Sequence, residues 1–219
     1  MERTTCIIPA RLGSKRLPKK NLRELSGVPL ITRAIRRAQS ARVFDEIWIS
    51  SESEDFLPIA ETEGVGFHKR QPWLGSDTAT SEDFIADFLN IHETDLLVQV
   101  HSVTPLLPSE EIAQFVRTFQ NSEADCFFSV RDTLLECVYN NEPINFVFSE
   151  KANSQELMPV HEICWGITGW RSGVFKAAAK QGKCATYAGR RGFLPSSRFG
   201  AIVIKTEEDL QMAEALFPL

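Results

Sequence analysis

The chain has 219 residues, 43% of them hydrophobic, and a formal net charge of -5 at pH 7. This length and hydrophobic content suit one folded domain and exclude a disordered chain, and the acidic balance argues against a nucleic-acid-binding protein. The apolar runs are also far shorter than the ~20 residues that a membrane-spanning helix needs.

Apolar strands alternate with amphipathic helices from residue 4 to residue 132. Residues 29–41 place their apolar side chains on one face at helical spacing, Ser81 is expected to cap a helix, and Pro108 precedes the helix-starting run Ser-Glu-Glu. We expect strands at 4–10, 46–51, 64–69, 95–102 and 124–132, and helices at 29–41, 55–63, 81–92 and 108–120.

The pattern loosens between about residues 134 and 155 and is regular again after residue 165. We expect strands at 165–170 and 199–205, and helices at 172–181 and 207–217. The alternation predicts an α/β fold with a mainly parallel sheet and helices on both faces. In such folds ligands bind at the carboxyl ends of the strands, where the loop after the first strand begins.

The loop from Pro9 to Asn21 concentrates positive charge in an acidic chain. Its cationic residues are Arg11, Lys15, Arg16, Lys19 and Lys20. A Gly-Ser turn after a strand can present backbone N–H groups to phosphate oxygens, and Arg and Lys supply the complementary charge. The loop has neither the Rossmann GxGxxG pattern nor a P-loop pattern. It is therefore either a cradle for an anion such as a triphosphate or a solvated basic loop.

The run IPARLGSKRLPKKN at residues 8–21 resembles the nucleotide-binding signature of the cytidylyltransferases that activate acidic sugars. These are the CMP-sialic acid (acylneuraminate) synthetases and their relatives for other nonulosonic acids, with the Kdo (3-deoxy-manno-octulosonate) cytidylyltransferases as cousins. Further segments are similar to motifs of this family: EIWISSESED (46–55), the stretch 70–85, VTPLLPSEEI (103–112) and KTEEDLQMAE (205–214). Together they cover most of the chain apart from roughly residues 134–190.

The resemblance implies a Rossmann-like, three-layer α/β/α nucleotidyltransferase fold. It implies one nucleotidyltransferase domain over residues 1–219, with an excursion at about 131–165 that helps to form a homodimer. The implied reaction joins CTP to a 2-keto-3-deoxy sugar acid, giving a CMP-sugar and pyrophosphate. The anomeric hydroxyl attacks the α-phosphorus, catalysis is mainly positioning and charge neutralisation, and the expected cofactor is Mg²⁺.

The resemblance also implies roles for residues of this chain, which all lie in or beside the matching motifs. Arg11, Lys15 and Lys20 would hold the triphosphate, and Asn21 would either order the loop or touch a phosphate or the ribose. The remaining substrate-binding candidates are the loop residue Ser14, the backbone around Pro9 and Ala10 with Arg70 at the cytosine, Asp77 and Ser81 beside the base pocket, and His101.

This chain departs from the family where carboxylates are expected to ligate the metal. Val203 and Lys205 stand at those positions in the last motif, and Val103 stands at a third. A Val cannot ligate Mg²⁺ and a Lys repels it. Three explanations remain open: the metal is held by the triphosphate with Glu52, Asp77 or Glu162; Lys205 replaces part of its charge; or the chain no longer catalyses.

Other departures from the family motifs concern the binding of the acceptor sugar. His101 is either a general base toward the sugar hydroxyl, because an ordinary histidine pKa lies near neutrality, or a strand-end histidine satisfied by hydrogen bonds. Trp165 stands where the family often has Asn, so the sugar need not be sialic acid. Arg190, Arg191 and Arg198 are candidates for contacting a carboxylate. Two alternative functions remain: a non-catalytic nucleotide-binding homologue, and a nucleotidyltransferase for another acceptor such as a phosphonate or sugar phosphate.

The cysteines and the first residues bear on cellular location. The five cysteines are dispersed without CxxC spacing, which is typical of reduced thiols. The first ten residues, MERTTCIIPA, lack the apolar region of a signal peptide. We therefore expect a cytoplasmic protein.

Overall fold

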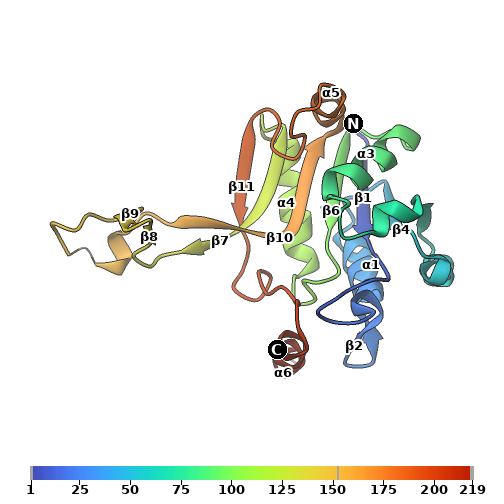
Figure 1. Ribbon diagram of the computed structural model, residues 1–219, viewed down its shortest axis with the longest axis horizontal. Helices are drawn as coiled ribbons and strands as arrows, with labels where there is room; N and C mark the ends of the chain where they lie inside the picture. Colours follow the sequence, from blue (N-terminus) through green and yellow to red (C-terminus); the bar gives the residue numbers. More distant parts are fainter. Residues whose placement is uncertain (1, 152, 218–219) are drawn as a thin grey trace.

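The computed structural model of the chain describes residues 2–151 and 153–217. Its central sheet has the strand order β11-β7-β10-β6-β1-β4-β5 (Figure 1). The strands are β1 (Thr4–Pro9), β4 (Glu46–Ser51), β5 (Gly66–Lys69), β6 (Leu96–Val100), β7 (Cys126–Thr133), β10 (Val160–Arg171) and β11 (Arg191–Pro195). β10 runs antiparallel to β6 and β7, and the other neighbouring pairs are parallel. The prediction of a mainly parallel sheet is confirmed.

Helices cover both faces of this sheet. The helices α1 (Leu30–Ala41), α2 (Leu57–Glu63) and α4 (Ser109–Gln120) pack on one face, and α3 (Ser81–Ile91) and α5 (Ser172–Lys180) pack on the other. Each face of the sheet has its own hydrophobic core, and alternate residues of β1 pack into the two. Cys6 and Ile8 face the first group of helices and Ile7 faces the second. The predicted α/β/α layers are therefore confirmed. Within the described residues, no helix combines the length and apolar character needed to cross a membrane.

A third, smaller core lies beside the basic loop. The helix α6 (Glu207–Leu216) packs against the short hairpin of β2 (Glu24–Leu25) and β3 (Val28–Pro29), and 3-10 turns cover Lys20–Leu22, Glu54–Phe56, Pro72–Gly75 and Ser154–Glu156. The buried residues of this core are Leu17, Leu25, Leu30, Ile204, Leu210 and Ala213. Because Leu17 belongs to the basic loop, the burial of its side chain fixes the middle of that loop.

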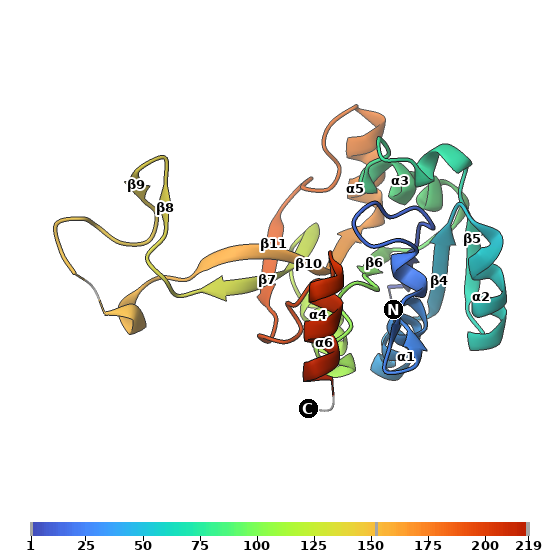
Figure 2. The same ribbon diagram turned by 60° about the horizontal axis from the view of Figure 1, so that its bottom comes forward.

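An arm projects away from the body of the molecule, to the left in Figures 1 and 2. It continues β7 and β10 beyond the body and contains β8 (Val138–Tyr139) and β9 (Glu142–Pro143). Asn145 holds it together, because its amide accepts from the Cys137 N–H (2.9 Å) and donates to the carbonyls of Leu135 (2.9 Å) and Met158 (3.0 Å). The predicted excursion at 131–165 covers this arm, apart from residue 152, which lies outside the described residues.

The predicted strand at 199–205 is wrong. These residues form a turn, with hydrogen bonds from the Ala201 N–H to the Ser197 carbonyl and from the Ile202 N–H to the Phe199 carbonyl, followed by chain without regular secondary structure. The segment is apolar because Ala201 and Ile204 are buried, and Ile204 lies in the small core beside the basic loop. The last strand of the sheet is instead β11, a short edge strand for which the sequence carries no clear signal.

The N-cap of α3 also differs from the prediction. Thr80, and not Ser81, caps this helix: the Thr80 hydroxyl accepts from the Asp83 N–H, and the Asp83 carboxylate accepts from the Thr80 N–H (2.7 Å). This reciprocal pair requires an acidic residue three positions after the cap, which Thr80 has in Asp83. Ser81 is therefore the first residue of the helix rather than its cap.

Candidate functional site

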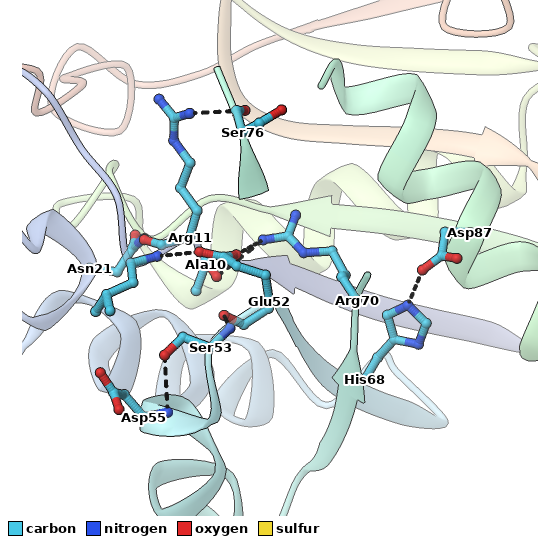
Figure 3. A network of polar contacts seen from close by, with 12 residues as sticks. Ala10, Arg11, Asn21, Glu52, Ser53, Asp55, His68, Arg70, Ser76 and Asp87 are labelled. Carbon is cyan, nitrogen blue, oxygen red and sulfur yellow. Dashed lines mark hydrogen bonds and ion pairs between the residues drawn. The ribbon is translucent and has the colours of Figure 1, made fainter. Parts of the chain in front are cut away.

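The start of the basic loop is held by two residues that follow neighbouring strands. Glu52 comes directly after β4 and Arg70 directly after β5, at the carboxyl edge of the sheet. Glu52 accepts from the Leu12 N–H (2.8 Å), and Arg70 donates to the Ala10 carbonyl (3.2 Å) and to Glu52 (3.1 Å) (Figure 3). The Arg70 side chain is only 2% exposed. The loop therefore leaves β1 along a path fixed by a buried ion pair.

The end of the loop is held by Asn21. Its side-chain amide donates to the Arg11 carbonyl (2.8 Å) and accepts from the Ser102 hydroxyl (2.6 Å), and Asn21 itself is buried. Lys20 reaches across to the Ile204 carbonyl (3.3 Å). These contacts favour the loop-ordering role for Asn21. They also argue against a merely solvated basic loop, because both ends and the middle are fixed.

The loop, the end of β6 and the segment around Ser76 enclose what we call the first cavity, of about 310 Å³. It is lined by the predicted site residues Pro9, Arg11, Lys20, Asn21, Arg70, Asp77 and His101. The remaining predicted residues do not line it: Ala10 supplies its carbonyl to Arg70, Ser14 and Lys15 lie on the loop, and Ser81 begins α3. The structure thus brings most of the predicted residues together at one cavity.

Asp77 changes the charge balance that the sequence predicts for the loop. Its carboxylate pairs with Lys15 (2.7 Å) and with Arg11 (3.1 Å), and hydrogen bonding from Lys15 leads the interactions that hold the pKa of Asp77 below its usual range. All three side chains are substantially exposed, so these pairs are weak and water screens them. A bound anion could therefore replace Asp77 as the partner of Arg11 and Lys15.

A second cavity, of about 560 Å³, lies next to the first. Its cationic lining residues are Arg16, Lys20, Arg131, Arg198 and Lys205. Lys20 lines both cavities, so they meet at this side chain. Of the three C-terminal arginines proposed to contact a carboxylate, Arg198 lines this cavity, whereas Arg190 pairs with Glu123 and Arg191 lies on β11. The position of Arg131 at this cavity was not predicted, because no local sequence signal links Arg131 to the basic loop, which lies more than a hundred residues earlier.

Trp165 reaches the second cavity through a distortion of β10. The pairing of β10 with β7 shifts register between Ile163 and Thr168, and Trp165 adopts a left-handed backbone with φ of 56°. For a bulky residue this conformation costs about 1–2 kcal/mol, and such strain gathers at functional sites. The same bulge positions Gly166, whose carbonyl accepts the His101 N–H (3.1 Å). Through this hydrogen bond the bulge that contains Trp165 contacts His101, which lines the first cavity.

His101 is held by hydrogen bonds at the end of β6. Its ring nitrogen Nε2 pairs with the Gln99 amide, and its carbonyl accepts from the Thr104 hydroxyl (3.1 Å). Burial, together with the charge of Lys20, lowers the pKa of His101 to about 4. The argument that a pKa near neutrality suits His101 to be a general base is therefore wrong, and its contacts favour the alternative of a satisfied strand-end histidine.

The low pKa of His101 predicts acid sensitivity. Between pH 6.5 and about 4 the unfolded chain binds a proton at His101 that the folded chain does not, so the free energy of unfolding falls as the pH falls. Replacing His101→Gln is expected to reduce the loss of unfolding free energy between pH 7 and pH 4.5 by about 2 kcal/mol. Urea unfolding at both pH values measures this. Equal losses in both proteins would contradict the assignment.

The carboxylates around both cavities already have partners. Glu52 pairs with Arg70, Asp77 with Arg11 and Lys15, and Glu162 with Arg131 and the Thr133 hydroxyl. The Asp209 carboxylate caps α6 by accepting from the backbone N–H groups of Lys205 and Thr206 (2.8 Å each). Over residues 2–151 and 153–217, no three His, Cys, Asp or Glu side chains gather as metal ligands. These residues do not fit a protein-ligated Mg²⁺.

Comparison with known proteins places this geometry in a family. A family model described as cytidylyltransferase matches residues 5–168. N-acylneuraminate cytidylyltransferase A of Danio rerio is 35% identical over 127 residues, which cover 58% of this chain and 30% of the relative. The pseudaminic acid cytidylyltransferase of Campylobacter jejuni subsp. jejuni serotype O:2 is 30% identical over 165 residues, which cover 69% of this chain and 71% of the relative. The chain thus spans about 30% of the length of the N-acylneuraminate relative.

Solved structures share the fold over almost the whole chain. A CMP:2-keto-3-deoxy-manno-octonic acid synthetase complexed with CTP has a TM-score of 0.74 at 15% identity, covering 99% of this chain and 98% of that one. A 4-diphosphocytidyl-2C-methyl-D-erythritol synthase from Anaerococcus prevotii has a TM-score of 0.71 at 13% identity, covering 100% and 97%. At these identities the likeness concerns the fold alone, a Rossmann-like nucleotidyltransferase fold.

Proposed function

The chain belongs to the cytidylyltransferase family, and on this premise we propose that it transfers CMP from CTP to a 2-keto-3-deoxy sugar acid and releases pyrophosphate. The acceptor class is drawn from the names of the relatives, which act on N-acylneuraminate and pseudaminic acid. The observation that carries the proposal is the junction at Lys20, where a cavity beside the nucleotide-binding signature meets a second, cationic cavity.

In this proposal the two cavities hold the two substrates. The cytosine lies in the first cavity, near the backbone of Pro9 and Ala10 and the Arg70 guanidinium. The triphosphate faces Lys20 and Arg11, which line this cavity, and Lys15, which pairs with its lining residue Asp77. The acceptor lies in the second cavity, where Arg198 can meet its carboxylate.

The transfer step follows from this placement. The anomeric hydroxyl oxygen of the acceptor attacks the α-phosphorus, the bond from that phosphorus to the bridging oxygen of the β-phosphate breaks, and pyrophosphate leaves while the hydroxyl proton passes to water. The cations lower the barrier by neutralising charge on the phosphates, and the cavities contribute by aligning the reactants.

Pyrophosphate release with CTP and a panel of keto-sugar acids tests this function. Release that depends on one of the acids is the expected result. CTP binding without release in the presence of any acceptor would favour the non-catalytic homologue instead. The cationic second cavity also suits a phosphonate or a sugar phosphate, so these acceptors belong in the panel. Release with them alone would favour a different acceptor class.

We further propose that the arm forms a homodimer. Its exposed large apolar side chains are Leu134, Leu135, Val138, Tyr139, Ile144, Val147, Phe148 and Met158. Exposed apolar surface of this density is typical of an interface, and a projecting arm offers it to a second copy of the chain.

The double replacement Tyr139→Ser/Phe148→Ser is expected to convert the dimer to a monomer, because these side chains are 70% and 67% exposed on the arm. Sedimentation equilibrium of the parent and the variant measures the mass. Met212→Ser is the matched control, since Met212 is 55% exposed on α6, away from the arm, and should leave the dimer intact. A monomeric parent or a dimeric double variant would contradict the proposal.

A cytoplasmic location stays a prediction. The cysteines at positions 6, 126, 137, 164 and 184 are all free thiols, which agrees with a reducing compartment.

A further inference from the structure

The segment from Val203 to Lys205 lies between the two cavities. Val203 and Lys205 line the second cavity. The Ile204 N–H donates to the carbonyl of Val103, a residue that lines the first cavity (2.8 Å), and the Ile204 carbonyl accepts from Lys20 (3.3 Å). The backbone thus fixes Lys205 beside Lys20, at the junction where the proposed function puts the triphosphate.

Two carboxylates, Glu162 and Asp209, line the second cavity beside its five cationic side chains, so the protein balances only part of the positive charge at this junction. Among the described residues, Arg16, Lys20, Arg198 and Lys205 form no ion pair. Burial lowers the pKa of Lys20, and the charges of Arg16, Arg11 and Lys205 lower it further, against the opposing effect of the Asp209 carboxylate. Holding these cations together is unfavourable in the free protein, so an anion of several charges is the ligand that relieves it.

A divalent cation has no comparable place here. The carboxylates that line the second cavity are Glu162, which pairs with Arg131, and Asp209, which accepts from the backbone N–H groups of Lys205 and Thr206, just before α6. Mg²⁺ prefers carboxylate, phosphate and water oxygens, whereas most of the charged side chains that line this cavity are Lys or Arg. An added Mg²⁺ would therefore be repelled rather than held.

We propose that Lys205, together with Lys20, supplies the positive charge that a protein-bound Mg²⁺ would otherwise supply to the phosphates, so that this chain binds CTP as the metal-free triphosphate. This inference rests on the proposed function and deepens it. Lys205 then acts as a catalytic residue, because its ammonium group contacts the β- and γ-phosphates and stabilises the departing pyrophosphate. Since Mg²⁺ complexed with CTP neutralises part of the charge that these lysines recognise, Mg²⁺ competes with the protein for the nucleotide.

Calorimetric titration of CTP into the full chain tests this in two buffers of matched ionic strength, one with EDTA and one with excess Mg²⁺. Matching is required because salt alone screens these charges. We expect the Kd for CTP to be about tenfold lower in EDTA. Lys205→Gln should raise the Kd in EDTA about tenfold, while Lys180→Gln, on α5 and lining neither cavity, should leave it unchanged.

For the double variant Val203→Asp/Lys205→Asp we expect the opposite effect, with a lower Kd for CTP in Mg²⁺ than in EDTA. It places two carboxylates at the junction, so Mg²⁺ should tighten CTP binding to it. Tighter CTP binding to the parent chain in Mg²⁺ than in EDTA would overturn the inference while leaving the proposed function intact. No CTP binding in either buffer would overturn both. Lys205→Gln alone keeps the test decisive if the double variant does not fold, because Lys205 is exposed and its removal opens no core.

Discussion

Replacing Lys20→Met is expected to lower kcat/KM for CMP transfer by about 10²–10³-fold, the usual cost of removing one preorganised charge-stabilising group. Lys20 is the side chain that lines both cavities, and its ammonium group is held at the junction by the Ile204 carbonyl. Methionine keeps most of the aliphatic length, so the change removes charge with little loss of packing. Steady-state pyrophosphate release measures the effect.

The control for this replacement is Lys180→Met, which removes the same charge from α5 and leaves both cavities unchanged. It should keep kcat/KM within about twofold. The stability of Lys20→Met should remain close to that of the parent, because burial and neighbouring cations already oppose the charge of Lys20 in the folded chain. Activity of Lys20→Met equal to that of the control would place the phosphates away from the junction.

Replacing Arg70→Met is expected to lower the free energy of unfolding by about 3–5 kcal/mol, because it leaves a largely buried partner charge uncompensated. The Arg70 side chain is 2% exposed and that of Glu52 is 16% exposed. The Ala10 carbonyl also loses its donor, so the start of the basic loop is released together with the carboxylate that holds Leu12. Urea unfolding measures the change.

Glu52→Gln separates the charge of this pair from its hydrogen bonds. Its side-chain carbonyl can still accept from the Leu12 N–H, so we expect a smaller loss for Glu52→Gln than for Arg70→Met. The double variant Arg70→Met/Glu52→Gln should be less destabilised than the sum of the single variants, since the uncompensated carboxylate is then absent. Additive losses would show that the two side chains do not act as a pair.

The sequence predicts the body of the fold well because its signals are local. The helix at 29–41 and the strand at 46–51 lie within a residue of α1 (Leu30–Ala41) and β4 (Glu46–Ser51), because periodicity and apolar runs define both. The segment 199–205 is apolar for another reason, since Ile204 fills a small core beside the loop. A short apolar run cannot by itself distinguish a strand from buried irregular chain.

The basic loop could be predicted, but its surroundings could not. The cluster from Arg11 to Lys20 is contiguous, so its charge is visible in the sequence. The pairing of Asp77 with Arg11 and Lys15, and the arrival of Arg131 at the second cavity, depend on contacts between distant segments. The low pKa of His101 likewise arises from burial, which its residue type does not reveal.

A structure of the chain with bound CTP tests most directly the claim that the triphosphate lies at the junction of the two cavities. We expect the cytosine in the first cavity beside Arg70, and the β- and γ-phosphates within hydrogen-bond distance of the ammonium groups of Lys20 and Lys205. Phosphates bound away from Lys20, or a Mg²⁺ ion between them and the segment 203–205, would contradict this account.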